Sequence, residues 1–379
     1  MKSTFINRLQ NSWNERFPFT QLFQQSLDYA VPINLNAWYI FGALAIFVTC
    51  SQFLTGIWLV FFYTPSVSLA FDSIQYIMRD VSYGWLIRYL HTTGASAFLL
   101  IIYLHMFRSL LYGSYKRPRE LVWLVGVILL ILLLAEAFCG YLLPWGQMSF
   151  WGANVVISAI QAVPVIGETL STFLRGDFAV SDATLHRFFA LHVIVIPLLF
   201  IGFIVFHIKT LHYVGSNNPE GKEDIKKIPF HPYYTVKDLL GICLFLIVIL
   251  TIVFFFPDMG GYFLEPSNQI PADSLVTPTH IQPLWYMAPF YAILRAIPNK
   301  TLGVFFAAAS VGLLFFLPWL DRNLLRSLRH RRWPSRVALL LYAISFIGLG
   351  YLGLVELTPL RQYCAQGLKC IYFGYFLLM

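Results

Sequence analysis

The sequence predicts an all-α integral membrane protein with eight transmembrane helices. Hydrophobic residues make up 58% of the 379 residues, and charged residues make up only 12%. Soluble proteins carry about 25% charged residues, so a soluble fold is excluded by composition. Several stretches without charges are also long enough to cross a hydrocarbon core of about 30 Å as helices.

The predicted helices follow one another along the whole chain. In order, they span residues 37–63, 89–107, 121–143, 188–208, 239–257, 301–320, 337–355 and 360–379. The third is interrupted by a single acid, Glu136, and the last is short and apolar. Residues 1–35 are polar with several aromatics, which predicts an amphipathic surface segment.

The net charge of +8 is distributed unevenly among the loops. Lysines and arginines gather in the loops that follow the second, fourth and sixth helices, whereas the alternate loops hold at least as many acids as bases. The positive-inside rule places the basic loops and both termini on the cytoplasmic or matrix side, here called the inner side. The arginine-rich loop joins two membrane helices, so no nucleic-acid partner is expected.

Two pairs of histidines lie in the second and fourth helices at nearly equal spacing. The interval from His91 to His105 is 14, and the interval from His192 to His207 is 15. At about 100° and 1.5 Å per residue, the members of a pair share one helix face and lie about 21–22 Å apart. Facing helices would present two His–His pairs, an outer His91/His192 and an inner His105/His207. This geometry favours two haems, each held by two imidazoles, over a metal cluster.

Other readings of the histidines fit less well. One intramembrane histidine often only hydrogen-bonds to a neighbouring helix, but four in two spaced pairs are hard to explain in that way. A proton-coupled transporter would be expected to show inverted repeats, and none is clear. Another kind of dihaem membrane anchor would be shorter, without a second, haem-free half. No CxxCH motif is present, so non-covalent b-type haem is expected.

Glycines and arginines accompany the histidines. The interval from Gly42 to Gly56 in the first helix is 14, and so is the interval from Gly126 to Gly140 in the third. Small residues allow close helix packing, and the shared interval suggests that each glycine leaves room for the edge of a flat macrocycle. Arg88 and Arg108 lie three positions from His91 and His105, where they either bind haem propionates or extend to the membrane surface.

Five segments carry a resemblance to a known family. They are GWLIRYLHTTGAS (84–96), GYLLPWGQMSFWGA (140–153), RFFALH (187–192), GSNNP (215–219) and IPFHPYYTVKD (228–238). The chain closely resembles cytochrome b, the dihaem subunit of ubiquinol–cytochrome c oxidoreductase, respiratory complex III. The resemblance implies a surface segment (1–35), a dihaem four-helix bundle (36–215) and a C-terminal membrane domain (216–379).

The resemblance also implies a function and partners. The family oxidises quinol on the outer side and reduces quinone on the inner side, and two haems pass electrons between these sites while protons are translocated (the Q cycle). By resemblance, His91/His192 hold the low-potential haem and His105/His207 the high-potential haem. Ubiquinone or ubiquinol is the expected substrate, and a Rieske iron–sulfur protein, cytochrome c1 and a second copy of the complex are the expected partners.

Two quinone sites are predicted. At the inner site, His212, Ser216, Lys237 and Asp238 are the candidates. A histidine and an aspartate on either side of a quinone suit hydrogen bonding to its carbonyls and proton delivery. At the outer site, the aromatic walls expected around a flat ring are supplied by two segments. The candidates there are Tyr141, Trp151, Gly152, Pro283, Trp285, Tyr286 and Tyr291.

The sequence departs from the family pattern at two places. The Pro-Glu-Trp-Tyr motif, whose glutamate is thought to accept a quinol proton, reads Pro-Leu-Trp-Tyr with Leu284. We hypothesise that Glu136 replaces this acid, with a packing contact or a role at a haem edge as the alternatives and His280 as another candidate. The longer interval between His192 and His207, with Pro197 inside it, predicts a local bulge. Both departures favour a bacterial inner membrane over the mitochondrial one.

Overall fold

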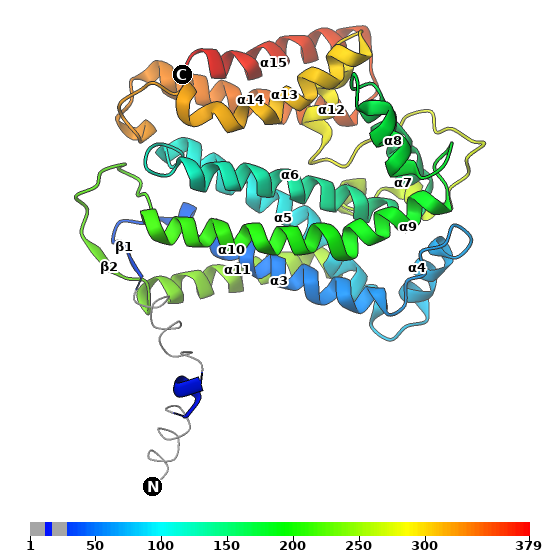
Figure 1. The fold of residues 1–379 in the computed structure, drawn as a ribbon, viewed down its shortest axis with the longest axis horizontal. Coiled ribbons are helices and arrows are strands. Elements are labelled where there is room, and N and C mark those ends of the chain that lie inside the picture. Colours follow the sequence, from blue (N-terminus) through cyan, green and yellow to red (C-terminus); the bar gives the residue numbers. More distant parts are fainter. Residues whose placement is uncertain (1–11, 17–28) are drawn as a thin grey trace.

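The computed structural model describes residues 12–16 and 29–379. The predicted surface segment 1–35 lies mostly outside the described residues. Among those that are described, seven helices are long and apolar enough to cross a membrane. They confirm the predicted helical membrane fold, and they run roughly side by side in Figure 1.

The membrane helices match the predicted order closely. They are α3 (Phe41–Val60), α5 (Gly84–Tyr112), α6 (Glu120–Leu142), the continuous run of α9 (Asp182–Ala190), η2 (Leu191–Val195) and α10 (Ile196–Val214), then α11 (Tyr233–Phe255), α13 (Lys300–Leu320) and α14 (Trp333–Leu354). The eighth predicted helix is α15 (Pro359–Leu377), which has 19 residues and packs against α14.

Short elements cover the two ends of the helices. At the end drawn on the right of Figure 1 lie α4 (Ala70–Arg79), α7 (Gln147–Gln161) and α8 (Gly167–Arg175). The connection from α11 to α12 (Ala288–Arg295) contains η3 (Met259–Gly261) and η4 (Pro266–Gln269). At the opposite end, β1 (Ala30–Pro32) pairs antiparallel with β2 (Lys227–Pro229), and η5 (Leu328–His330) precedes α14.

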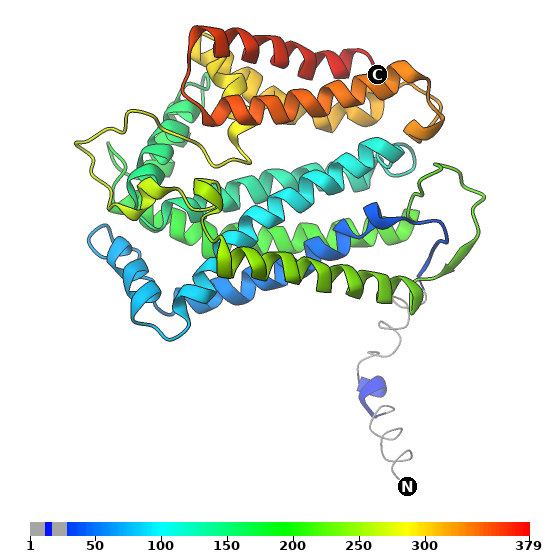
Figure 2. The same ribbon diagram turned by 180° about the vertical axis from the view of Figure 1, so that it is seen from behind.

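The helices form two layers, which Figures 1 and 2 show from opposite sides. One layer contains α12 to α15, and the other contains α3, α5, α6, the α9–α10 run and α11. Within the second layer α3 packs on α5, α6 packs on α10, and α11 packs on both α5 and α3. The helix pairs α3–α5 and α6–α10 are therefore the ones that bring the predicted glycines against the predicted histidines.

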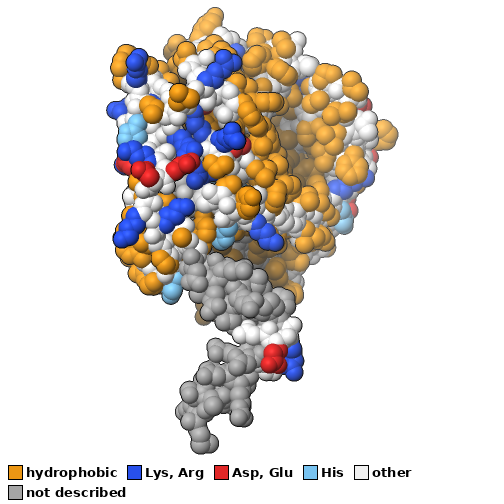
Figure 3. Space-filling view, turned by 60° about the vertical axis from the view of Figure 1, so that its left-hand side comes forward, with side chains coloured by type: hydrophobic (Ala, Val, Ile, Leu, Met, Phe, Trp, Pro, Cys, Tyr) orange, Lys and Arg blue, Asp and Glu red, His pale blue; other side chains and the backbone are white. Residues whose placement is uncertain are grey.

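The charged loops gather at one end of the bundle. Figure 3 views the end that carries the β1–β2 sheet and shows many lysine and arginine side chains beside apolar helix surfaces. The loops between α5 and α6, between α10 and α11 and between α13 and α14 all reach this end. The three loops that are rich in lysine and arginine therefore lie at the same end of the bundle, as the alternation of loop charges along the sequence predicted.

A buried ionic cluster joins the two layers at this basic end. The Asp321 carboxylate, just after α13, accepts a hydrogen bond of 2.5 Å from Arg331 and one of 2.5 Å from the Tyr115 hydroxyl. Lys116 lies 3.1 Å from the same carboxylate. Burial raises the pKa of Asp321, but the hydrogen bonds from Arg331 and Tyr115 outweigh it, so this pKa lies below its ordinary value.

Replacing Asp321 with asparagine is expected to destabilise the fold. It leaves buried Arg331 without a counter-charge, and losing one member of a buried ion pair costs about 3–5 kcal/mol of unfolding free energy. Because the pKa of Asp321 is depressed, its stabilising effect is present above about pH 4 and is lost as the pH falls further. Denaturant titrations in detergent at pH 7 and pH 3 measure both effects.

Glu223→Gln is the matched control for this prediction. Glu223 pairs with Arg326 at the same end of the molecule, but its side chain is exposed to solvent, so the variant should unfold like the native protein. Equal unfolding curves for Asp321→Asn and Glu223→Gln would show that the cluster contributes no stability.

Candidate functional site

The outer histidine pair brings two imidazoles close together between α5 and η2. The ring centres of His91 and His192 are 6.2 Å apart, and the ring planes are nearly perpendicular at 89°. Two imidazoles bonded to one metal from opposite sides, with metal–nitrogen bonds of about 2.0 Å, have ring centres about 6 Å apart. The spacing therefore fits a haem, whose iron His91 and His192 would hold.

The pattern of donors also fits haem rather than a bare metal ion. In the part of the chain that the structure describes, no three histidine, cysteine, aspartate or glutamate residues form a group that could hold a metal ion. A pair of imidazoles supplies two ligands, which is the number that a haem iron would take from the protein. The porphyrin nitrogens of haem supply the other four positions.

Each of the four glycines faces one of the four histidines. A Cβ atom added at Gly140 would lie 2.5 Å from Cε1 of His192, and one at Gly56 would lie 3.1 Å from Cε1 of His91. The corresponding distances are 3.6 Å from Gly42 to His105 and 3.4 Å from Gly126 to His207. The glycines thus clear space for the imidazole rings themselves, and the predicted room for a macrocycle edge stays a prediction.

One turn of π-helix accounts for the longer histidine interval. η2 (Leu191–Val195) begins beside His192, and the Ile196 N–H donates to the Leu191 carbonyl five positions earlier. A π-turn of this kind inserts one residue into an α-helix. Because the π-turn takes up the extra residue, the angle about the helix axis from His192 to His207 equals the angle from His91 to His105. The bulge predicted in the interval that contains Pro197 is confirmed.

The inner histidines lie among positive and aromatic groups. His105 is three positions before Arg108, whose guanidinium lies 3.3 Å from His105 Nδ1 and 4.6 Å from the centre of the Tyr39 ring. His207 faces the third glycine, Gly126. Arg108 thus turns toward the bundle interior, as a propionate-binding residue would, instead of extending to the membrane surface.

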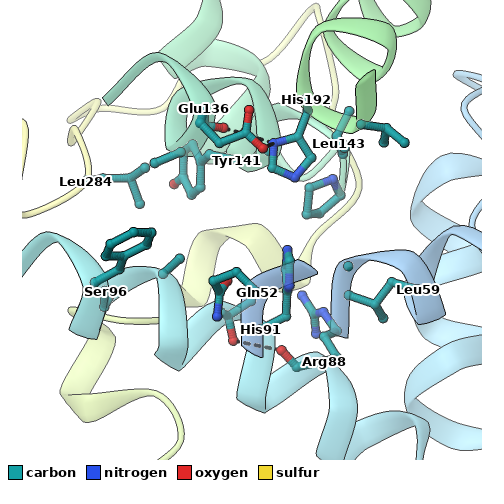
Figure 4. Close-up of a pocket in the computed structure, with 18 of the residues that line it drawn as sticks. Gln52, Leu59, Arg88, His91, Ser96, Glu136, Tyr141, Leu143, His192 and Leu284 are labelled. Atoms are coloured by element: carbon teal, nitrogen blue, oxygen red, sulfur yellow. Dashed lines mark hydrogen bonds and ion pairs between the residues drawn. The ribbon is translucent and has the colours of Figure 1, made fainter. Parts of the chain in front are cut away.

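A cavity of about 270 Å³ opens beside the outer pair. His91, His192 and Arg88 line one part of it, and Tyr141, Leu284 and Tyr286 line another. Figure 4 shows His91 and His192 directed toward each other across this space, with Tyr141 and Leu284 to one side. The outer histidines therefore share one mostly apolar cavity with two of the predicted outer quinone residues, Tyr141 and Tyr286.

Several residues predicted for the outer quinone site do not line this cavity. Trp285 donates its indole N–H to Ser96 Oγ over 3.3 Å, and Trp151 donates its own to the Asp273 carbonyl over 3.2 Å. Pro283 and Tyr291 are also absent from the lining. Gly152 lies behind the wall, since a Cβ atom there would sit 3.8 Å from the Tyr141 ring.

Glu265 and Asn268 are polar residues of the cavity lining that the sequence did not single out. Glu265 immediately precedes η4 and Asn268 lies within it, and this segment is fixed against α7. The Asn268 side chain accepts from the Ser149 N–H over 2.8 Å, and the Gln147 N–H donates to the Ile270 carbonyl over 3.0 Å. Glu265 reaches the cavity because its segment pairs with α7, which is distant in the sequence. No local sequence motif indicates this position.

Glu136 lies at the haem-ligand end of the cavity. Its Oε1 is 3.0 Å from Nδ1 of His192, and its backbone carbonyl is also 3.0 Å from the same nitrogen. Glu136 therefore contacts a predicted haem ligand, and its functional role stays a prediction. The predicted proton acceptor Glu136 is thus already engaged by a histidine, whereas Glu265 is not.

Two of the inner quinone candidates, His212 and Ser216, lie against Tyr29, which the sequence did not single out. The Tyr29 ring stacks on His212 with ring centres 4.2 Å apart, and its hydroxyl lies 3.4 Å from Ser216 Oγ. Lys237 Nζ lies 4.4 Å from the centre of the Tyr233 ring, and Asp238 follows it on α11. Tyr29 therefore brings His212 and Ser216 together, while Lys237 packs on a different tyrosine.

The fold and the paired histidines define a haem-binding membrane protein, and comparisons with known proteins agree. Residues 26–215 match a family model described as cytochrome b/b6/petB, and residues 271–373 match one described as cytochrome b (C-terminal)/b6/petD. The cytochrome b of Allochromatium vinosum is 49% identical over 97% of this chain and 94% of its own length.

Two further comparisons extend the match. The cytochrome b/c1 of Bradyrhizobium diazoefficiens is 44% identical over 97% of this chain and 53% of its own length. A solved structure of a hyperthermophilic respiratory complex III superposes with a TM-score of 0.89 at 37% identity, covering 97% of this chain and 96% of the other. The chain belongs to the cytochrome b family, which confirms the resemblance seen in the sequence, and its role is that of the cytochrome b subunit of a cytochrome bc complex.

Proposed function

We propose that this chain binds two b-type haems and carries electrons from a quinol at the outer side to a quinone at the inner side. The single observation that carries the proposal is the outer pair, whose ring centres are 6.2 Å apart at the wall of a cavity that also holds Tyr141 and Tyr286. His91/His192 are the outer ligands, and His105/His207 are the inner ones. A bound haem supplies one-electron redox chemistry at its iron.

The residues of the outer cavity position the quinol and receive its protons. Tyr141 and Tyr286 form an aromatic wall, and the apolar side chain of Leu284 closes it without offering a proton acceptor. Glu265 supplies a carboxylate to the same cavity. Arg88 is buried on the ligand side, where its charge suits a haem propionate. Trp151, Gly152, Pro283, Trp285 and Tyr291 support this wall from outside the cavity.

At the inner side, His212, Ser216 and Asp238 are the quinone-binding residues, with Lys237 beside them. The stacking of Tyr29 on His212 supports this assignment, because a quinone is also a flat ring. Histidine and aspartate can deliver the protons that quinone reduction consumes. This part of the proposal predicts that ubiquinone is reduced on the side of the membrane that carries the basic loops.

The chain does not complete quinol–cytochrome c oxidoreduction by itself. A quinol releases two electrons, and the haems of this chain take one of them. We propose that the other passes to a Rieske iron–sulfur protein and then to cytochrome c1, and that the complex forms a homodimer. The fused cytochrome b/c1 relative supports the second partner. The bacterial inner membrane is the proposed location, which the relative from Allochromatium vinosum supports. The division at residues 35 and 215 likewise remains a proposal.

Spectroscopy and turnover together test this function. A reduced-minus-oxidised spectrum of the purified complex should show b-type bands, and extraction should yield two haems per chain. The complex should also reduce cytochrome c with ubiquinol, in a reaction that outer-site inhibitors abolish. Absence of b-type bands would overturn the electron-transfer role, and bands without quinol turnover would overturn the proposed substrate.

Replacing Glu265 with glutamine is expected to slow quinol oxidation by about 10²-fold, the usual contribution of a general base. Two carboxylates line the cavity, and Glu136 already contacts His192. The substitution removes the other one, that of Glu265. Steady-state quinol–cytochrome c turnover measures the effect, with the haem spectrum as a check on assembly. Glu168→Gln, at an exposed position on α8 at the same end, is the control. Native turnover in Glu265→Gln would exclude this residue as the proton acceptor.

A further inference from the structure

The four proposed haem ligands differ in the group that faces Nδ1, the ring nitrogen away from the iron. His91 Nδ1 lies 2.9 Å from the Thr55 hydroxyl, which donates its own proton to the Ser51 carbonyl over 2.7 Å. His105 Nδ1 faces the Arg108 guanidinium at 3.3 Å. Among the described residues, His207 Nδ1 has no hydrogen-bond partner.

His192 is the one ligand of the four whose Nδ1 contacts a carboxylate. Glu136 Oε1 lies 3.0 Å from this nitrogen, and the dashed line in Figure 4 marks the contact. Both side chains are largely buried, with exposed fractions of 22% for Glu136 and 17% for His192. Glu136 precedes Gly140 by one turn of α6, so the helix that makes room for the imidazole also supplies its hydrogen-bond acceptor.

We infer that Glu136 is a positioning residue that holds His192 and lowers the reduction potential of the outer haem. The inference rests on the proposed function, because it assumes that His192 binds a haem iron. An Nδ1–H that donates to a carboxylate fixes the tautomer in which Nε2 is free to bind the metal. The same hydrogen bond makes the imidazole a more basic ligand.

Two effects of Glu136 act on the potential in the same direction. A more basic axial ligand favours the ferric iron over the ferrous iron, because ferric iron carries the greater positive charge. A negative carboxylate in a site of low dielectric constant favours the ferric state for the same electrostatic reason. The neutral Thr55 hydroxyl at His91 offers neither effect to the same degree, so the carboxylate is the main asymmetric influence.

The inference gives Glu136 a part in the direction of electron flow. In the proposed pathway electrons leave the outer haem for the inner haem, and this transfer is downhill when the outer potential is the lower one. An arginine accompanies each pair, since Arg108 lies beside His105 and Arg88 lines the outer cavity with His91, and each positive charge favours the ferrous state. The Glu136 carboxylate is therefore the charge that distinguishes the outer pair, and it lowers the outer potential relative to the inner one, in the direction that drives electrons inward.

A redox titration of the Glu136→Gln complex tests this inference. At a fixed ambient potential, the ratio of reduced to oxidised outer haem should rise about tenfold, which is about 59 mV for one electron. The inner haem should titrate as in the native complex and is the internal control. Thr55→Val, which removes the hydroxyl at the opposite ligand, should shift the outer potential by less.

The outcomes separate this inference from the proposed function. An unchanged outer potential in Glu136→Gln, with both haems present, would overturn it and would assign the hydrogen bond to the Glu136 backbone carbonyl. If the glutamine variant does not retain the outer haem, Glu136→Asp is titrated instead. This shorter carboxylate should give a potential above the native one, and a value at or below native would overturn the inference. If the native complex shows no b-type bands, the proposed function itself fails.

Discussion

Replacing Gly140 with alanine is expected to remove the outer haem and to leave the inner one in place. The added Cβ would lie 2.5 Å from Cε1 of His192, closer than side-chain atoms can approach, so the imidazole must turn away from His91. The haem content per chain should fall by about half, and quinol–cytochrome c turnover should be lost with it. Haem extraction and a low-temperature reduced spectrum measure the result.

Gly202→Ala is the matched control for this substitution. Gly202 lies in α10, in the same bundle, and a Cβ atom added there would have no heavy atom of another residue within 4 Å. Alanine also favours a helix over glycine, so this variant should keep both haems and full turnover. A Gly140→Ala complex with both haems at native potential would show that the bundle can widen at this level.

The second large effect concerns the register of the helix that carries His192 and His207. Inserting one alanine after Gly202 should rotate His207 by about 100° relative to His192 and abolish binding of the inner haem. Deleting Ile194 should instead convert the π-turn to regular α-helix and retain both haems. Ile194 is 56% exposed, so its deletion removes little packing within the bundle. Haem content and the spectrum of each variant give the outcome.

These two changes test the same feature from opposite directions. The deletion makes the interval between His192 and His207 equal to that between His91 and His105, in a helix without a bulge. The insertion adds a residue with no π-turn to absorb it. Loss of the inner haem in the Ile194 deletion would mean that the π-turn has a role beyond register. Retention of both haems in the insertion variant would mean that the helix can form a second bulge.

The sequence predicted the features that depend on local periodicity. The helix order, the alternating loop charges and the two histidine pairs all follow from residues a few turns apart, and the structure contains each of them. The π-turn was predictable because the interval from His192 to His207 exceeds that from His91 to His105 by one, which requires one inserted residue. The shared interval linked the glycines to the histidines, but it predicted room for a macrocycle edge, whereas the structure places the imidazole rings themselves at the glycines.

The features that the sequence did not predict depend on contacts between distant segments. Glu265 reaches the outer cavity because the connection before α12 pairs with the start of α7, more than a hundred residues earlier. Trp285 appeared to be a wall residue from its motif, yet its indole bonds to Ser96 on α5. The contact of Glu136 with His192 likewise depends on the packing of α6 against η2, which no spacing rule specifies.

The ionic cluster around Asp321 has a consequence for how the chain is made. Tyr115 and Lys116 are synthesised about two hundred residues before the aspartate that pairs with them. During translation, Tyr115 and Lys116 in the loop between α5 and α6 therefore have no Asp321 to contact until α13 has been inserted. Trp123 on α6 likewise gains its hydrogen-bond acceptor only when α13 is present, because its indole donates to the Leu314 carbonyl over 2.6 Å.

The two layers therefore close late in biogenesis, when the emerging second half docks on a bundle that is already in the membrane. A nascent chain that stops before α13 would lack the Asp321 carboxylate that Lys116 and Tyr115 contact in the complete fold. The contacts of Asp321 can therefore stabilise the packing of the first helices only after the chain has been made as far as the end of α13. Joining both halves in one chain ensures that each bundle receives its partner in equal number.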